Sequence, residues 1–410
     1  MKIHGSRILI CQPMMYSFTG STMVTLELSE YLQSAGAEVT IFTDIFDEPI
    51  KSIAQKKRLK VVCFDDDPEL HLDTFDLIWI HSQILPKSII SDLKTIKDKK
   101  LPAFVFLHMS PLDYCADEKA WIYGFEEKMS DLSLAISDTT KLAINKNLNK
   151  EIHFFRNPAP AVFAGIKRKR VESLKNILIV SNHPPREVIE ACNILKRDYK
   201  INTTLLGQDG KYRPVTPGLL SKYDLVITIG KTVQYCLVSG TPVYIYDRFG
   251  GDGYLNNKNF EENKSTNFSG NFMAEDRKRF AGPEELAKDI FEHYSSAVLY
   301  QKSQISNFQE DFLINKVLPR LLRNLSVSKK TSLSEEYVSY LEMCQNLARH
   351  CIFYGMYDAH RTRFRLKEST ALADDLRKEN EKISNDIAEI KSARSYKIIK
   401  KVHLILFGRH

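Results

Sequence analysis

One segment of the sequence, residues 223–254, limits the possible folds more than any other. It opens with a short, β-branched apolar run at residues 225–229, which is typical of a buried parallel strand. Gly230 then permits a tight turn into a helix, and a second apolar run at residues 243–246 follows that helix. A strand, a helix and a second strand in this order predict part of a parallel α/β sheet.

The start of this helix is a candidate binding site for an anion. The first amides of a helix lack partners within it, and here they would face the carboxyl edge of the sheet with the positive end of the dipole. Gly230 lets the backbone come close, Lys231 adds a cation and Thr232 adds a hydroxyl. A simple turn and helix cap is the other interpretation. A nucleotide-hydrolysing P-loop is excluded, because Leu225 stands where that loop needs a glycine.

The length and the charge distribution limit the class of protein. A chain of 410 residues exceeds what one core supports and suggests two domains with an extension. The formal net charge is +7, but residues 391–410 hold six Lys or Arg and no acidic residue. The rest of the chain therefore carries only about +1, and we expect no nucleic acid as a partner.

The sequence also predicts where the protein works and what it binds. It opens without a basic and apolar leader and has no apolar run of about 18 residues, so we expect a cytoplasmic protein. The seven cysteines form no C-x-x-C pair, which favours reduced thiols over disulfides or a zinc site. An acidic run at residues 65–67 is interpreted as a solvated turn. We expect neither a metal nor a cofactor.

Alternating strands and helices predict a doubly wound α/β fold. Apolar runs recur from RILICQ to LSLAIS with helical or loop stretches between them, and a second series runs from NILIVS to VYIY. We therefore predict two tandem Rossmann-like domains, at residues 1–160 and 161–325, with a cleft between them. Strand signals then stop, so residues 326–410 are predicted to form a helical extension.

The extension contains two candidate interaction segments. Within residues 366–390, apolar residues and Asn380 follow a heptad pattern that predicts a short parallel coiled coil and hence a homodimer. Docking of this helix on its own protein is the alternative. Residues 391–410 combine lysines with apolar residues and could lie on an anionic membrane surface. A basic helix end packed on the protein is the other interpretation of that segment.

Several motifs, taken in order, resemble glycosyltransferases of the GT-B fold. The opening ILICQPMMYSFTGSTMVTLELSEYLQSAGAEVTIFT is similar to the family's first strand, glycine-bearing loop and helix. FDLIWIHSQ and AFVFLHMSP resemble its strand ends that bring a histidine to the cleft, and GKTVQYCLVSGTPVYIY resembles its donor-binding helix and strand. YDRFGGDGYL with a later NFSG resembles a bacterial surface-polysaccharide subgroup, similar to family 4. The resemblance covers roughly residues 5–325.

The resemblance implies a transferase that moves a sugar from a nucleotide-sugar donor to a glycan or lipid-linked acceptor in the synthesis of a bacterial surface polysaccharide. Many relatives carry a glutamate for the donor ribose five positions before Gly240, where this chain has Tyr235. A phenol offers one hydrogen bond and cannot bind two hydroxyls as a carboxylate does. A non-catalytic scaffold on the same fold and a sugar-nucleotide epimerase therefore stay open as alternatives.

His108 and Asp113 are the candidate catalytic residues. His108 ends an apolar strand and is expected to face the cleft, where an imidazole could accept a proton from an acceptor hydroxyl. Asp113 follows five residues later and is the alternative base. A strand-end histidine bonded to the backbone and a turn-forming aspartate are the structural interpretations.

The remaining candidates would contact the donor. Gly20 and Ser21 could let a loop approach the donor phosphates, or they form a turn and cap. Arg186 could neutralise the diphosphate together with Lys231, because a departing nucleoside diphosphate gathers negative charge, or it is a surface arginine. The glycine-rich loop after residue 246 could meet sugar or ribose hydroxyls, with a plain turn as its alternative. The predicted donor set is Gly20, Ser21, Arg186, Gly230, Lys231, Thr232, Tyr235, Asp247, Gly250, Gly251 and Asp252.

Overall fold

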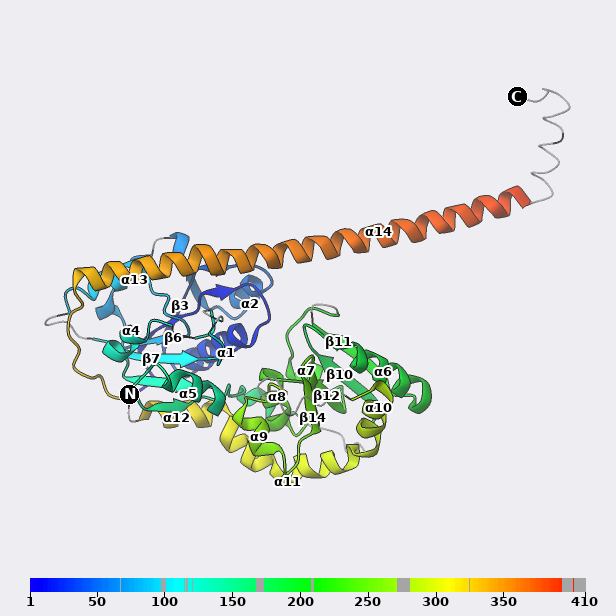
Figure 1. Cartoon of the computed structure of the whole chain (residues 1–410), viewed down its shortest axis with the longest axis horizontal. Coiled ribbons are helices and arrows are strands. Elements are labelled where there is room, and N and C mark those ends of the chain that lie inside the picture. Colours follow the sequence, from blue (N-terminus) through cyan, green and yellow to red (C-terminus); the bar gives the residue numbers. More distant parts are fainter. Residues whose placement is uncertain are drawn as a thin grey trace. The chain divides into compact units, whose positions relative to one another are not determined.

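The protein is described by a computed structural model (Figure 1) that covers residues 1–66, 68–96, 101–113, 115, 117–119, 121–166, 173–207, 210–270, 281–323, 325–392 and 401. Contacts within the chain divide it into two compact units, Met1–Arg349 and His350–His410. The first unit contains all the sheets of the described residues and the candidate site. The second unit is helical in the residues that the structure describes.

The first domain is built on a seven-stranded sheet in which all neighbouring strands are parallel. In spatial order the strands are β5 (Lys60–Cys63), β3 (Glu38–Thr43), β1 (Arg7–Cys11), β6 (Leu77–Ile80), β7 (Ala103–His108), β8 (Leu132–Ala135) and β9 (Ile152–Phe154). A short parallel pair, β2 (Met14–Met15) and β4 (Ile45–Phe46), lies apart from this sheet. The central strands β1, β6, β7 and β8 are mostly apolar and largely buried, which is what a sheet covered on both faces requires, whereas the edge strand β5 is partly exposed.

The connecting helices of the first domain are α1 (Gly20–Ser34), α2 (Ile50–Lys56), α3 (Lys87–Asp92), α4 (Tyr123–Met129) and α5 (Asp138–Asn145). One core combines strand residues such as Trp79 and Val105 with Val24 and Leu28 of α1. The helix α1 begins after Thr19, whose side chain accepts a hydrogen bond from the backbone amide of Thr22. This cap fixes the start of α1 at the carboxyl edge of the sheet.

The second domain has a five-stranded sheet. In spatial order its strands are β11 (Asn202–Leu206), β10 (Asn176–Val180), β12 (Leu225–Thr228), β13 (Val243–Asp247) and β14 (Gly250–Tyr254). The first four are parallel, whereas β14 pairs with β13 in the antiparallel direction. The helices are α6 (Arg186–Tyr199), α7 (Pro217–Leu220), α8 (Lys231–Ser239), α9 (Phe260–Ser265), α10 (Pro283–Glu292) and α11 (Tyr294–Phe312).

The predicted glycine-rich loop after β13 is therefore an edge strand. Gly251 explains why: a Cβ atom at this position would clash with the carbonyl oxygen of Ile245 on the paired strand. Gly250 adopts a φ of +74°, which side chains rarely tolerate. The glycines thus serve the hairpin between β13 and β14.

The chain returns to the first domain after α11. Ile314, Leu318 and Leu322 of α12 (Ile314–Arg323) are buried in the first domain's core. The helix α13 (Glu335–Leu347) follows, and the side-chain oxygen of its Gln345 accepts a hydrogen bond from the backbone amide of Leu85. The helix Ile314–Arg323, which the sequence analysis assigns to the second domain, therefore packs on the first.

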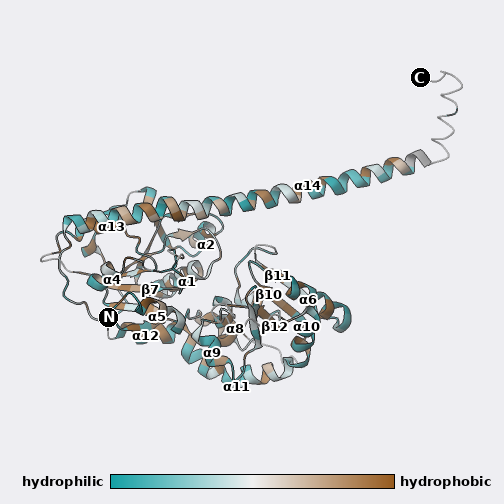
Figure 2. Ribbon diagram, viewed as in Figure 1, coloured by the Kyte–Doolittle hydropathy of each residue, from teal (hydrophilic) through white to brown (hydrophobic). Residues whose placement is uncertain are grey.

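The predicted fold class, α/β with two tandem Rossmann-like domains and a helical C-terminal extension, is confirmed by these sheets and helices. The extension contains the long helix α14 (Tyr354–Ser392), which mixes hydrophilic and hydrophobic residues along its length (Figure 2). Several of its large apolar side chains are exposed, among them Leu366, Leu376, Ile383 and Ile387. The predicted membrane-binding segment, residues 391–410, lies almost entirely outside the described residues. No helix in the described part of the chain is both long and apolar enough to cross a bilayer.

Candidate functional site

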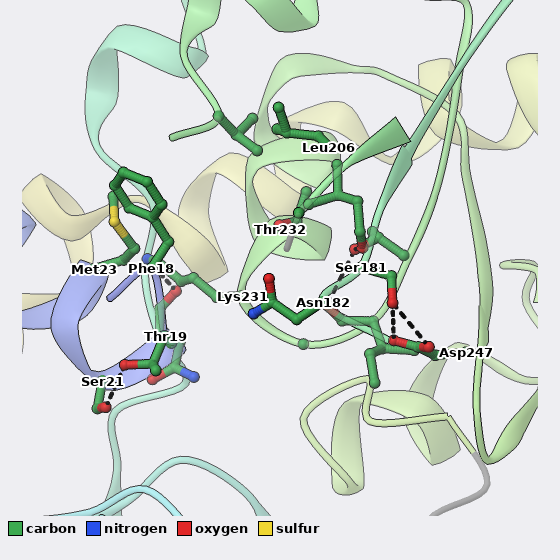
Figure 3. Close-up of a pocket in the computed structure, with 18 of the residues that line it drawn as sticks. Phe18, Thr19, Ser21, Met23, Ser181, Asn182, Leu206, Lys231, Thr232 and Asp247 are labelled. Atoms are coloured by element: carbon green, nitrogen blue, oxygen red, sulfur yellow. Dashed lines mark hydrogen bonds between the residues drawn. The ribbon is translucent and has the colours of Figure 1, made fainter. Parts of the chain in front are cut away.

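A cavity of about 500 Å³ lies where the strand ends of the two domains meet. Its size falls within the range of small-molecule sites in proteins. The first domain contributes Phe18, Thr19, Gly20, Ser21, Met23, Met109, Glu118, Ile136 and Asn157. The second domain contributes residues that follow β10, β11, β12 and β13, and Figure 3 shows several side chains from both domains around the cavity. Ligands of open α/β sheets bind at this edge.

The start of α8 opens into this cavity, as the sequence predicts. Gly230 and Thr232 both line the cavity. Gly230 has a φ of +63° and no neighbouring atom within 4 Å of the place where a Cβ would stand, so its backbone angle, rather than space, requires glycine. The amide of Gly230 donates to the carbonyl oxygen of Phe268 at 2.8 Å. The amide of Val233 donates to the carbonyl oxygen of Gly230 at 2.9 Å, so within the described residues the amides of Lys231 and Thr232 are the donors that the start of this helix offers to a ligand.

Lys231 does not offer its charge to the cavity, although its side chain forms part of the wall. Its ammonium group lies 2.7 Å from the carboxylate of Glu27 on α1 and donates to the carbonyl oxygens of Asn157 and Pro158, at 3.0 and 2.7 Å. Burial lowers the pKa of Lys231 and raises the pKa of Glu27, and the ion pair opposes both shifts. Its predicted role in neutralising a diphosphate is therefore corrected: the ammonium joins the two domains.

Tyr235 belongs to the same buried cluster. Its hydroxyl donates to the other carboxylate oxygen of Glu27, and its ring stacks on Phe163 with centroids 4.2 Å apart. A carboxylate thus stands beside position 235, but it comes from the first domain and both its oxygens are engaged. We refer to Glu27, Lys231 and Tyr235 as the closed cluster.

Asp247 lies at the cavity as predicted. Its carboxylate accepts hydrogen bonds from the hydroxyl of Ser181, at 3.1 Å to each oxygen, and from the backbone amide of Arg248 at 2.8 Å. Burial raises the pKa of Asp247. These bonds tie the end of β13 to the end of β10 and fix one wall of the cavity.

Two arginines that the sequence analysis missed carry positive charge at the cavity. Arg213 and Arg248 both line it, and both side chains are exposed. The guanidinium of Arg248 lies over the ring of Phe249, 4.6 Å from its centroid. Arg248 directly follows β13, so a search of strand ends for cations would have found it. Arg213 follows no strand and gave no comparable signal.

Four residues of the predicted donor set lie away from the cavity: Arg186, Gly250, Gly251 and Asp252. The Arg186 side chain is 90% exposed on α6 and pairs with Glu190 at 2.7 Å. Gly250 and Gly251 belong to the edge strand β14. The carboxylate of Asp252, in the same strand, accepts a hydrogen bond from the side-chain amide of Asn263 at 3.0 Å. None of the four lines the cavity. Gly20 and Ser21, by contrast, lie in its wall at the start of α1.

Both predicted catalytic residues also lie outside the cavity. His108 is fully buried, and its Nε2 is 3.0 Å from the carboxylate of Glu126, which accepts a second hydrogen bond from Ser133. The side chain of Asp113 is 91% exposed and pairs with Lys119 at 2.7 Å. This hydrogen bond lowers the pKa of Asp113, which makes the carboxylate a weaker base. His108 packs inside the first domain, and Asp113 lies on the surface.

Glu118 is the carboxylate of the first domain that does line the cavity. It comes from the loop after β7, and the hydroxyl of Ser21 lies 3.5 Å from its carboxylate. Burial, followed by the charge of Asp117, raises the pKa of Glu118 to about 8. No sequence signal marks this residue, because the loop has neither an apolar period nor a recognisable motif. Within the described residues, no group of three or more His, Cys, Asp or Glu side chains could hold a metal ion.

Comparisons with known proteins give matches among solved structures alone: no protein-family model matches the chain, and no curated protein sequence matches it. A glycosyltransferase from Rickettsia africae is 12% identical, with 78% of this chain and 97% of that chain covered and a TM-score of 0.49. A calicheamicin glycosyltransferase is 12% identical over 78% and 99% of the two chains, with a TM-score of 0.45. A variant of Staphylococcus aureus TarM, solved in complex with UDP, is 10% identical over 78% and 99%, with a TM-score of 0.44.

Proposed function

We propose that this protein is a glycosyltransferase that moves a sugar from a nucleotide-sugar donor to a hydroxyl of a glycan or lipid-linked acceptor, in the synthesis of a bacterial surface polysaccharide. One observation carries the proposal: the 500 Å³ cavity combines the start of α8 with two guanidinium groups. Free helix amides and guanidinium groups are the donors that proteins use for phosphate oxygens. A diphosphate bound there would lie between the two domains.

The residues at the cavity have separate roles in the proposed reaction. The amides at the start of α8, the Thr232 hydroxyl and the guanidinium groups of Arg213 and Arg248 would bind the diphosphate and stabilise the charge that grows on it as it leaves. Asp247 would accept a hydrogen bond from a donor hydroxyl. The cations are part of the chain, so the proposed reaction uses no metal and no cofactor.

Nucleotide binding tests the proposal directly. The full-length protein is heated with UDP, GDP, ADP, TDP or CMP, and we expect the melting temperature to rise with at least one of them, because a ligand that binds the folded state stabilises it. The double variant R213A/R248A should lose this increase. R186A is the matched control, because its arginine lies outside the cavity, and it should keep the increase. No shift with any nucleotide would refute the proposal.

A non-catalytic scaffold is the second candidate, and the closed cluster favours it. A lysine and a tyrosine at the expected donor helix are both engaged with Glu27, which leaves the donor ribose without a free carboxylate at this point. Turnover separates the two functions. Hydrolysis or transfer of a sugar from the nucleotide-sugar that binds would exclude the scaffold, whereas binding without turnover in the presence of a glycan acceptor library would support it.

We further propose that the protein is cytoplasmic and that its extension both forms a dimer and holds the protein at a membrane surface. The exposed apolar side chains of α14, including Leu376, Ile383 and Ile387, would pair with the same helix of a second copy, and residues 391–410 would bind an anionic membrane surface. Light scattering should give a dimer that becomes a monomer in L376E/I383E. Vesicles with anionic lipid should retain the full chain and release a chain that ends at residue 390. A monomeric full chain or equal vesicle binding would contradict the respective part.

A further inference from the structure

Glu118 lies at the junction of two cavities. The first is the 500 Å³ cavity at the start of α8, and the second measures about 330 Å³. Glu118, from the loop after β7, and Arg248, from the end of β13, line both of them. A carboxylate and a guanidinium group therefore stand where a molecule in one cavity would meet a molecule in the other.

The second cavity has hydroxyl groups in its wall, which can contact the hydroxyls of a sugar. They belong to Ser110, Ser137, Thr139, Thr140, Thr266 and Ser269. Several of them already have partners in the protein: those of Ser137, Thr139 and Thr140 bond to one another at the start of α5, and that of Thr266 donates to the carbonyl oxygen of Asn263. Because the first cavity suits a diphosphate and the second suits a sugar, the junction is the place where an acceptor hydroxyl would approach the donor.

The carboxylate of Glu118 is available for chemistry. Among the described residues, the partner of the Glu118 side chain is the Ser21 hydroxyl, which donates a hydrogen bond to it at 3.5 Å. The adjacent Lys119 is turned to Asp113, with which it pairs at 2.7 Å. Glu118 thus differs from Glu27, whose oxygens are both taken by a cation and a phenol.

Burial, and after it the charge of Asp117, favours the protonated form of Glu118, whereas the Ser21 hydroxyl favours the carboxylate, as does any nearby cation. On its own loop it faces Asp117 and the thiol of Cys115, whose pKa burial raises to about 11, and across the cavity it faces Arg248. Burial and Asp117 raise the pKa of Glu118 to about 8. A carboxylate with a raised pKa is a stronger base, and proton transfer is most effective when the pKa of the base lies near the working pH.

Building on the proposed glycosyl transfer, we propose that Glu118 is its general base. The acceptor oxygen forms a bond to the anomeric carbon while its proton moves to Glu118. The bond from that carbon to the diphosphate oxygen breaks, and the electron pair leaves with the nucleoside diphosphate beside Arg248. A single displacement of this kind inverts the configuration of the anomeric carbon.

Proton uptake on nucleotide binding tests the position of Glu118 without any turnover. The full-length protein is titrated with UDP, or with whichever nucleoside diphosphate gives the largest thermal shift, at pH 8 in buffers of different ionisation enthalpy. A diphosphate beside Glu118 raises its pKa further, so the wild type should take up part of a proton. E118Q should bind within about threefold as tightly and lose this uptake. D113N, whose carboxylate lies outside both cavities, should behave as the wild type. Equal uptake in E118Q and the wild type would overturn the proposal.

Hydrolysis of the matching nucleotide-sugar, with water as acceptor, tests the chemical role. E118Q should lower the rate about 100-fold or more with little change in KM. The rate of the wild type should rise with pH to a plateau above about 8, and E118Q should lose this rise. UDP-glucose, an α-linked donor, should release β-glucose first in an NMR time course. An unchanged rate in E118Q, or release of the α anomer, refutes the role of Glu118 alone; absence of nucleotide binding would instead refute the proposed function.

Discussion

Glu27 and Glu118 both belong to the first domain and both approach residues of the second, but their surroundings differ. Glu27 pairs with an ammonium group, accepts a hydrogen bond from a phenol and is 8% exposed. Its charge therefore stabilises the contact between α1 and α8. Glu118 lines two cavities and has a hydroxyl as its hydrogen-bond partner. The same interface therefore contains a carboxylate that stabilises structure and one that is free to react. Burial with a full set of partners separates the first role from the second.

The largest effect is expected where the closed cluster is broken. K231M leaves the carboxylate of Glu27 buried without a cation, which should lower the free energy of unfolding by about 3–5 kcal/mol. The double variant E27Q/K231M removes both charges and should recover most of that loss. Urea unfolding followed by circular dichroism measures both values. A loss below about 1 kcal/mol in K231M would show that the pair is no more than a surface contact.

A smaller effect is expected where the open cavity loses a cation. R248A removes one charged donor for a phosphate oxygen, and such a bond contributes about 1.5–3 kcal/mol, so the Kd of the nucleoside diphosphate should rise about 10- to 100-fold. The fold should keep its stability, because the Arg248 side chain is exposed. Calorimetry at one fixed salt concentration gives the Kd. An unchanged Kd would show that the diphosphate does not bind beside the end of β13.

The contrast also predicts a pH dependence of stability. The folded protein holds a proton on Glu118 up to about pH 8, whereas an unfolded glutamate releases it near pH 4.5. The folded state therefore binds more protons between these values, and stability should fall as the pH rises from 5 to 8.5. The part due to Glu118 should be on the order of 1 kcal/mol, because solvent screens a half-buried carboxylate. E118Q should lack this part in thermal unfolding across that range, and an identical pH curve would contradict the raised pKa.

The sequence predicts the frame of this molecule well. Short β-branched runs identify the parallel strands, and Gly230 identifies the start of α8 at their carboxyl edge, because both signals are local. For the edge strand β14 the sequence predicts a loop, since glycines usually favour turns. Gly251 instead removes a Cβ that would prevent pairing with Ile245, a constraint that only the paired strand reveals.

The roles of individual side chains could be predicted only in part. Lys231 pairs with Glu27, 204 positions earlier in the chain, and His108 pairs with Glu126, on a helix that follows its strand. Neither partner can be read from the residues around the motif. Glu118 and Arg213 stand in loops without a period. Lys231 and His108, charged or polar residues at motif positions, became structural because the fold gave them partners, whereas Asp247 at a motif position and Glu118 without a motif both line the cavity.

The smallest effect is expected at Arg186, which the sequence predicts to neutralise the diphosphate. Arg186 lies on α6 with 90% of its side chain exposed and pairs with Glu190 one turn away. R186A should lower the free energy of unfolding by only about 0.3–0.5 kcal/mol, the usual worth of such a helix pair. The Kd of the nucleoside diphosphate should stay within twofold of the wild type, since no part of Arg186 lines the cavity. Calorimetry beside R248A provides the comparison. A tenfold weaker affinity in R186A would place the diphosphate at the start of α6, and the division between engaged and available charges would then have to be redrawn around that helix.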